Sequence, residues 1–193
     1  QKRNDSHNGE EPYNYFLTVL FPHNQMQILD YNRVVKDLNG AAAEQFLEAL
    51  SKKFTIEEAD LALAKPGKAR EFGLYLGGKG LKLTANDTLQ SQIDDNDPVA
   101  SLDVSILQDA VFSPLLEIHD QRTDKRVDFV GGIRGLAELE KRVDSGEWAA
   151  AFALFATSIE SLMAIADANE VMPPKSTWFE PKLRDGMFSH QIG

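Results

Sequence analysis

The sequence predicts an α+β fold with a mixed, largely antiparallel sheet, hairpins and three to four packed helices. Two hairpin patterns come early, at residues 15–31 and 72–84, and helical patterns alternate with strand patterns from residue 97 onward. Hairpins favour antiparallel pairing, and interspersed helices can cover the faces of the resulting sheet. We therefore expect one domain over residues 13–193, preceded over residues 1–12 by a polar linker or by the end of a preceding element.

The first predicted hairpin begins with a strand that is apolar on both faces. Residues 15–21 alternate so that Phe16 and Leu20 share one face and Leu17 and Val19 share the other. Such a strand is typically covered on both sides. The turn signal at residues 22–24 then predicts a second strand over residues 26–31.

A helix and a second hairpin are expected next. Residues 41–54 place apolar side chains at helical spacing, with Phe46 and Leu50 facing the core and Phe54 at the helix end. Residues 72–76 and 81–84 read as strands, because the Gly-Gly-Lys-Gly turn between them readily adopts positive φ.

The second half of the chain alternates helices and strands. Asp97 followed by Pro98 predicts a helix start, with the helix ending before Pro114. A strand over residues 126–130 and a helix over residues 136–143, which stops at Gly146, follow.

The last predicted elements begin with the most apolar strand, residues 148–155. Thr157 and Glu160 have capping-box spacing for a helix whose left-handed end falls at Asn169. An irregular stretch then leads to a short final strand near residues 187–190.

The composition excludes several kinds of chemistry. The 193 residues include no cysteine, so disulfides, thiolate nucleophiles and zinc–thiolate sites are ruled out. The formal net charge of −10 disfavours nucleic-acid binding, and no apolar run approaches the roughly 20 residues that span a membrane. We expect a cytoplasmic chain. Because it begins with Gln1, we also expect it to be cut from something longer.

Familiar catalytic and metal-binding motifs are missing. The four histidines lie in no metal-binding pattern, and no set of carboxylates or Ser, His and Asp has a spacing that indicates catalysis. The run Pro174-Lys175-Ser176-Thr177 resembles the end of a Walker A loop. However, Pro174 replaces the required glycine and has no N–H to donate to a phosphate.

The strongest candidate site is the irregular stretch over residues 172–186. Its cations could hold a phosphate and its hydroxyls could orient it. The alternative is a structural loop in which Trp178 and Phe179 fill the core. The candidate phosphate- or substrate-binding residues are Lys175, Ser176, Thr177, Lys182 and Arg184.

A second candidate is the charged loop over residues 120–126. Arg122 or Arg126 could reach a carboxylate or a phosphate there, although a solvated loop of paired charges is the alternative. Gly131 and Gly132, which follow a strand, could admit a close approach by backbone or ligand.

Three segments carry a family resemblance. These are YNYFLTVLFPHNQMQILDYNRVVKDLNG (residues 13–40), FGLYLGGKGLKLT (residues 72–84) and the region from residue 124 to MPPKSTWFEPKLRDGMF (residues 172–188). They resemble the C-terminal half of the bacterial and archaeal family known as domain of unknown function 1015. The N-terminal half of that family carries an Asp-Gly-His-His-Arg motif that this chain lacks. That motif is similar to the nucleotide-binding signature of the ParB and sulfiredoxin superfamily, which includes a free-serine kinase.

The resemblance implies a role for the whole protein as a nucleotide- or phosphate-dependent small-molecule enzyme. It would be serine-kinase-like, with ADP or ATP as its nucleotide and the N-terminal half of the same protein as its partner. The family pattern matches Asp128, Gly131, Gly132, Pro173, Pro174, Lys175, Ser176, Thr177, Phe179, Lys182 and Gly186.

Two other readings of the function stay open. The chain could be a non-catalytic scaffold or dimerisation module that supports the N-terminal half, and a homo-oligomer is one form that it could take. DNA binding by analogy with ParB is a third reading, which the net charge of −10 disfavours.

Overall fold

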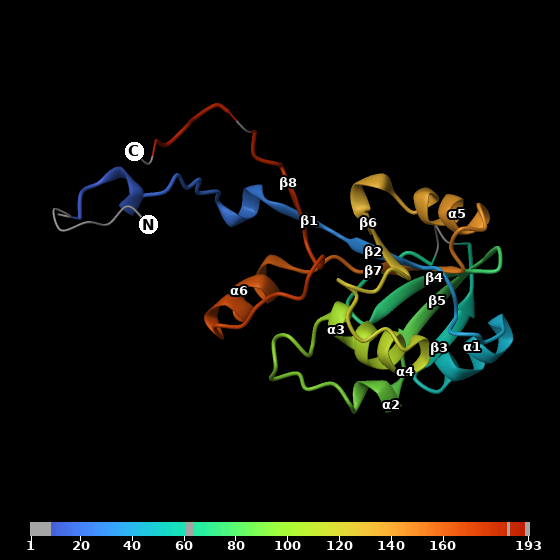
Figure 1. Ribbon diagram of the computed structural model, residues 1–193. Coiled ribbons are helices and arrows are strands. Elements are labelled where there is room, and N and C mark those ends of the chain that lie inside the picture. Colours follow the sequence, from blue (N-terminus) through green and yellow to red (C-terminus); the bar gives the residue numbers. More distant parts are fainter. Residues whose placement is uncertain (1–8, 61–63, 185, 192–193) are drawn as a thin grey trace. The chain divides into compact units, whose positions relative to one another are not determined.

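The computed structural model describes residues 9–60, 64–184 and 186–191 (Figure 1). The chain divides into two units. One comprises residues 28–178, and the terminal segments 1–27 and 179–193 make up the other. Most of the secondary structure and all of the core described below belong to the 28–178 unit.

The centre of the 28–178 unit is a six-stranded sheet with strand order β3-β5-β4-β7-β2-β6. All five pairings are antiparallel. The α+β class and the largely antiparallel sheet are therefore confirmed. The strands are β2 (Tyr31–Val35), β3 (Phe54–Glu58), β4 (Glu71–Leu76), β5 (Lys79–Ala85), β6 (Val127–Gly131) and β7 (Ala150–Leu154). A separate two-stranded sheet pairs β1 (Gln27–Leu29) with β8 (Trp178–Glu180).

The α-helices lie in the segments that connect these strands. The longer ones are α1 (Ala43–Ser51), α5 (Ala137–Asp144) and α6 (Ile159–Asp167). A continuous helical run joins α3 (Asp103–Leu107), the π-helical segment η3 (Gln108–Phe112) and α4 (Ser113–Leu116). The shorter elements are α2 (Asp87–Gln90), η1 (Pro12–Asn14), η2 (His23–Gln25) and η4 (Gly132–Arg134).

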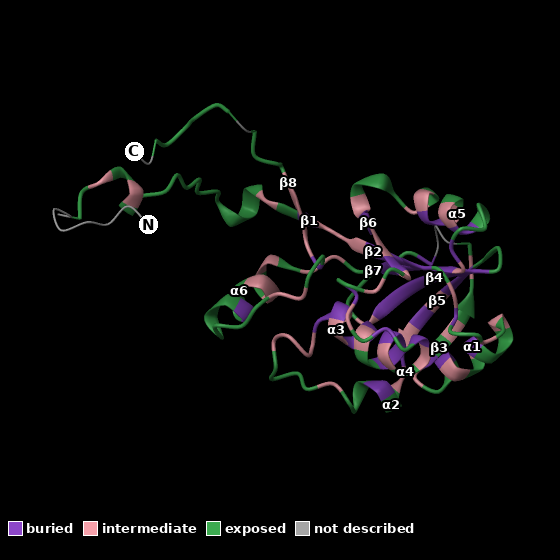
Figure 2. Ribbon diagram, viewed as in Figure 1, coloured by how far each residue is buried: buried purple, intermediate pink, exposed green. Residues whose placement is uncertain are grey.

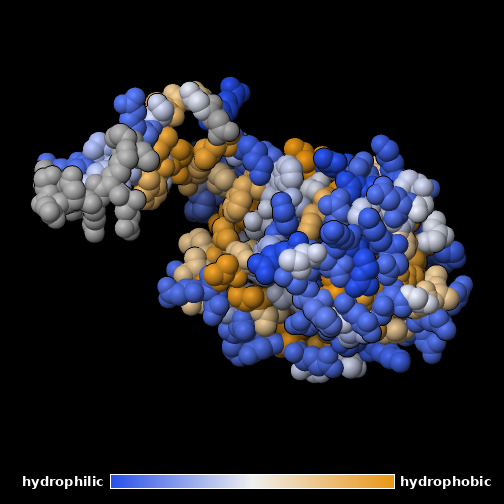
Figure 3. Space-filling view, in the orientation of Figure 1, coloured by the Kyte–Doolittle hydropathy of each residue, from blue (hydrophilic) through white to orange (hydrophobic). Residues whose placement is uncertain are grey.

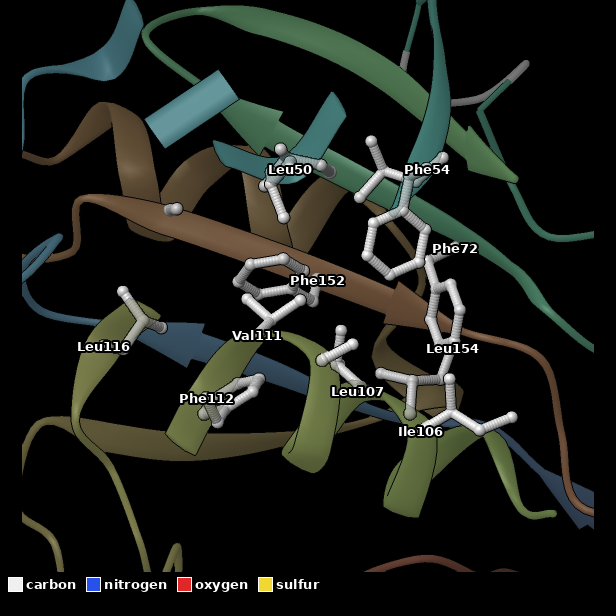
Figure 4. Packing of buried hydrophobic residues seen from close by; sticks show 14 of the residues in the cluster. Leu50, Phe54, Phe72, Ile106, Leu107, Val111, Phe112, Leu116, Phe152 and Leu154 are labelled. Carbon is white, nitrogen blue, oxygen red and sulfur yellow. The ribbon is translucent and has the colours of Figure 1, made fainter. Parts of the chain in front are cut away.

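The larger hydrophobic core lies between the sheet and the helices α1, α3, η3 and α4 (Figure 4). The rings of Phe112 and Phe152 meet there at 5.5 Å between centroids, and those of Phe54 and Phe72 at 5.8 Å. A smaller core, which includes Leu139 of α5, covers the opposite face. The central strands are consequently buried on both faces, as Figure 2 shows in purple.

The outer surface is mostly hydrophilic on the face seen in Figure 3. This agrees with a formal net charge of −10. Within the described residues, no helix has both the length and the apolar character needed to cross a membrane.

Several sequence predictions are confirmed. The hairpin of β4 and β5 turns at Gly77 and Gly78, whose φ values are 59° and 79°. The strands β6 and β7 and the helix α5 occupy the expected segments, and Asn169 has the expected left-handed conformation with φ 56°.

The predicted hairpin over residues 15–31 is wrong. Residues 15–22 adopt no regular structure, and the side chains of Phe16 and Leu20 are 83% and 89% exposed. Two short 3-10 turns, η1 and η2, bracket this stretch and break the extended chain at Pro12 and after Pro22. The expected final strand near residues 187–190 is also wrong, since no strand forms there.

Three helix boundaries also differ from the prediction. The helix α1 stops at Ser51, so that Phe54 begins β3. Asp97 caps only a turn, accepting bonds from the amides of Val99 and Ala100, and the helix begins at Asp103. Pro114 lies within the helical run, directly after the π-helical segment η3, and not beyond its end.

The cap of α6 is shifted by one residue. The Oγ atom of Ser158, not that of Thr157, accepts the bond from the Ser161 amide at 3.0 Å. The hydroxyl of Thr157 instead donates to the carbonyl oxygen of Ser176 at 3.2 Å. Thr157 therefore ties the start of α6 to the irregular loop that follows the helix.

Candidate functional site

The loop over residues 173–178 connects α6 to β8 in a tightly held conformation. Lys175 has a left-handed backbone with φ 55°, which is uncommon for a residue with a side chain. The hydroxyl of the buried Ser176 donates to the carbonyl oxygen of Pro173. The bond from Thr157 holds the Ser176 carbonyl oxygen. The hydroxyl of Ser176 is thus already used to shape the loop.

This loop places an exposed ammonium group above an aromatic cluster. Lys175 Nζ lies 5.7 Å from the centre of the Tyr31 ring. The Tyr31 ring packs in turn against Trp178 at 5.6 Å and against Phe129 at 6.1 Å. No carboxylate among the described residues forms an ion pair with Lys175. The ammonium group is held by a ring face and keeps donors for a ligand.

The two glycines at the end of β6 allow a close approach, but the groups that approach them belong to the protein itself. A Cβ atom at Gly131 would lie 2.4 Å from Cε3 of Trp178. One at Gly132 would lie 2.3 Å from Asp30 Oδ1. The side chains of Trp178 and Asp30 therefore occupy the space that the sequence had suggested for a close approach.

A cavity of about 480 Å³ adjoins this loop. It is lined by residues of the loop 97–100, by α3 and η3, by residues 119–122, and by Pro173 and Pro174. We call it the Gln121 pocket. Its size falls within the usual range for small-molecule sites. The pocket brings Arg122 and the two prolines, which come from separate candidate segments of the sequence, to one place.

A buried arginine forms a hydrogen bond to Gln121, one of the residues that line this pocket. Arg33 on β2 is 1% exposed, and its burial lowers the guanidinium pKa to about 9. Its Nε–H donates to Gln121 Oε1 at 3.1 Å, its Nη1 donates to the carbonyl oxygen of Tyr31, and its Nη2 is buried without a partner. Its guanidinium also lies 5.0 Å from the Phe129 ring centre. The structure thus holds a buried charge that no carboxylate among the described residues compensates, an arrangement that normally costs stability.

The hydrogen bonds of Arg33 continue along the pocket wall. Gln121 Nε2 donates to Gln108 Oε1 at 2.7 Å. Gln108 Nε2 then donates to Ser113 Oγ at 2.7 Å and to the carbonyl oxygen of Ile118 at 2.8 Å. Gln108 belongs to the π-helical segment η3, a helix type that often marks functional sites.

The pocket also carries acidic groups. Hydrogen bonds from the side chain and backbone of Arg122 lower the pKa of Asp120, and that carboxylate raises the pKa of Arg122. The amides of Ala100 and Val99 lower the pKa of Asp97. Both carboxylates are therefore ionised at neutral pH. Asp109 on η3 adds a third, exposed carboxyl group.

The remaining candidate residues lie elsewhere. Arg142 of α5 forms an ion pair with Asp128 at 2.5 Å, and it lowers the pKa of Asp128 although burial alone would raise it. Lys182 and Arg184 are exposed residues of the other unit. Among the described residues, no cluster of three or more His, Cys, Asp or Glu could hold a metal ion.

Sequence reasoning missed the polar relay of Arg33, Gln108 and Gln121. A signal was present, because Arg33 directly precedes the apolar pair Val34 and Val35 in a strand that is almost wholly buried. An inward arginine needs a partner. That partner, Gln121, is 88 residues away in the sequence, and its position could not be read from local patterns.

Comparison with known proteins gives one family. The model described as "Protein of unknown function (DUF1015)" matches residues 1–105. The resemblance expected for residues beyond 105 stays a prediction. A search of curated proteins finds no match.

Solved structures show only distant similarity. A free serine kinase in complex with AMP is 18% identical, with a TM-score of 0.44 and coverage of 81% of this chain and 54% of that one. A conserved hypothetical protein from Pyrococcus furiosus is 19% identical, with a TM-score of 0.46 and coverage of 81% and 56%. The chain spans about half the length of these proteins.

Proposed function

This chain belongs to the DUF1015 family of proteins of unknown function, and we propose that it is the C-terminal part of a cytoplasmic nucleotide- or phosphate-dependent enzyme. The reaction would be serine-kinase-like, with ADP or ATP as the nucleotide. The name of the distantly similar free serine kinase is compatible with this reaction. The proposal itself rests on the site described above.

The proposal rests mainly on the surroundings of the Lys175 ammonium group. Its ammonium group is exposed, has no carboxylate partner in the described structure, and lies over the Tyr31 ring. The loop behind it is fixed by the bonds of Ser176 and Thr157. A fixed, unpaired cation suits a phosphate, because a charge-assisted hydrogen bond forms with little loss of side-chain freedom.

The other candidates take supporting roles in this proposal. Ser176 shapes the loop through its bond to Pro173, and Thr177 follows directly with a partly exposed side chain. Lys182 and Arg184 belong to the second unit, and the proposal for the Lys175 loop does not depend on them. The N-terminal half of the family would supply the reacting groups.

The test compares Lys175→Ala with Lys141→Ala. Lys141 is an exposed lysine of α5, which packs on the opposite face of the sheet. Titration calorimetry with inorganic phosphate, ADP and ATP should show that Lys175→Ala lowers the binding affinity by about tenfold or more. This is the contribution expected of one hydrogen bond to a charged group. Lys141→Ala should bind like the wild type. Equal affinities in all three proteins would overturn the proposal.

The scaffold alternative is favoured by a different observation. Residues 15–21 expose apolar side chains, among them Phe16 and Leu20, and large exposed patches often mark protein interfaces. The N-terminal half of the protein or a second copy of the chain would cover them. In that case Phe16→Ser combined with Leu20→Ser should lower the assembly mass in analytical ultracentrifugation, while Lys175→Ala leaves ligand binding unchanged.

A further inference from the structure

The Gln121 pocket presents a defined hydrogen-bond donor. Arginine has only donors, so Gln121 must turn its Oε1 toward Arg33 and its Nε2 toward Gln108. Gln108 Nε2 donates both of its hydrogens, one to Ser113 and one to Ile118. Gln121 Nε2 donates one hydrogen to Gln108, and its second hydrogen has no acceptor among the described residues. Because Gln121 lines the cavity, an acceptor on a ligand there could meet that second N–H.

The charges of the pocket exclude a phosphate from its interior. Asp97, Asp109 and Asp120 line the cavity, and Arg122 alone of the lining residues carries a permanent positive charge. Arg122 is already paired with Asp120. A phosphate in the cavity would meet unbalanced carboxylates, so repulsion disfavours it. An uncharged group with a carbonyl-type acceptor and N–H or O–H donors avoids this cost and can also bond to Asp109.

The position of the prolines connects the pocket to Lys175. Pro174 lines the cavity and Lys175 is the next residue in the chain. Val99 and Val104 provide further apolar wall. A planar ring could therefore lie between these apolar groups while a phosphate attached to it reaches the ammonium group of Lys175 outside.

We propose that the Gln121 pocket binds the nucleoside end of a nucleotide, with a base acceptor on Gln121 Nε2–H and donors on Asp109. The inference deepens the proposed function, because it assigns the uncharged part of the ligand whose phosphate Lys175 binds. The volume of about 480 Å³ accommodates a nucleoside-sized group. Arg33 is a positioning residue, since it fixes the orientation of the Gln121 amide and does not line the cavity.

The experiment uses four nucleosides without phosphate (adenosine, guanosine, cytidine and uridine) together with ADP. Two variants alter the pocket. Gln121→Glu removes the amide donor and gives Arg33 a carboxylate, so the fold should be retained. Ser105→Phe fills the cavity from α3, where Ser105 lines it. The matched control is Gln90→Glu, since Gln90 bonds the carbonyl oxygen of Ala85 and lies outside the pocket.

At least one nucleoside should bind to the wild type and to Gln90→Glu with equal affinity. Its affinity should fall about tenfold in Gln121→Glu, where a donor is replaced by a charged acceptor, and be lost in Ser105→Phe. Lys175→Ala should leave nucleoside binding unchanged and weaken ADP alone. The inference is overturned if no nucleoside binds, or if Ser105→Phe binds like the wild type.

The same titrations separate this inference from the proposed function. If ADP binding depends on Lys175 but not on Ser105 or Gln121, the phosphate site stands and the nucleoside site fails. If nucleoside binding depends on Gln121 but the affinity for ADP is unchanged in Lys175→Ala, the nucleoside site is supported and the phosphate role of Lys175 is refuted.

Discussion

Replacing Asp103 with Asn tests how the 28–178 unit handles a buried acid. Asp103 is the first residue of α3, and its Oδ1 accepts a bond from the Arg70 amide at 2.8 Å. Burial raises its pKa from the ordinary 3.8 to about 6, although the bond from the Arg70 amide and the charge of Arg70 oppose the rise. The Arg70 guanidinium itself contacts Asp95. An Asn at position 103 keeps the acceptor and removes the charge.

The shifted pKa of Asp103 makes the free energy of unfolding depend on pH, because proton binding is linked to folding. Below pH 3.8 both the folded and unfolded states hold the proton, so the buried acid costs nothing. As the pH rises from 3.8 to about 6, only the unfolded state ionises, and the folded state loses relative stability. Above pH 6 the full cost is present, at most about 3 kcal/mol for a rise of this size.

Urea unfolding at pH 3.5 and at pH 7.5 measures the difference between the wild type and Asp103→Asn. The two proteins should be nearly equal in free energy of unfolding at pH 3.5. At pH 7.5 the variant should be more stable, by up to about 3 kcal/mol. A variant that is equally stable or less stable at pH 7.5 would refute the reasoning, because it would show that the ionised carboxylate is compensated in the folded state.

Two further substitutions test the packing around the site. Gly131→Ala should lower the free energy of unfolding by about 1–3 kcal/mol and change the tryptophan emission, because the new Cβ would lie 2.4 Å from the Trp178 ring; unchanged emission and stability would contradict this packing. Ser158→Ala should cost about 1 kcal/mol and increase hydrogen exchange in the first turn of α6, because its Oγ caps the Ser161 amide. Equal exchange rates in that turn would contradict the assigned cap.

The elements that the sequence predicted correctly are those with local signals. The hairpin of β4 and β5 depends on consecutive glycines at positive φ, and α5 and β7 have clear apolar patterns bounded by Gly146. The strand predicted over residues 15–21 failed, because an apolar alternation indicates a strand only where a neighbouring strand can pair with it.

The candidate site was predictable only in part. The loop with Lys175 and the charged segment with Arg122 were visible as unusual composition. Their connection through the Gln121 pocket depends on α3 and η3, which bring Gln108 to Gln121 across the fold. The length of the helical run was not visible either, since a proline within it indicated an earlier end.

Phosphate binding by Lys175 is measured most directly by a titration with inorganic phosphate that is followed by amide NMR spectra of the labelled protein. We expect saturable shifts for the amides of Lys175, Ser176 and Tyr31, with no change at Lys141. The substitution Lys175→Ala should abolish these shifts. Shifts confined to other regions, or shifts that persist in Lys175→Ala, would contradict the claim that Lys175 binds the phosphate.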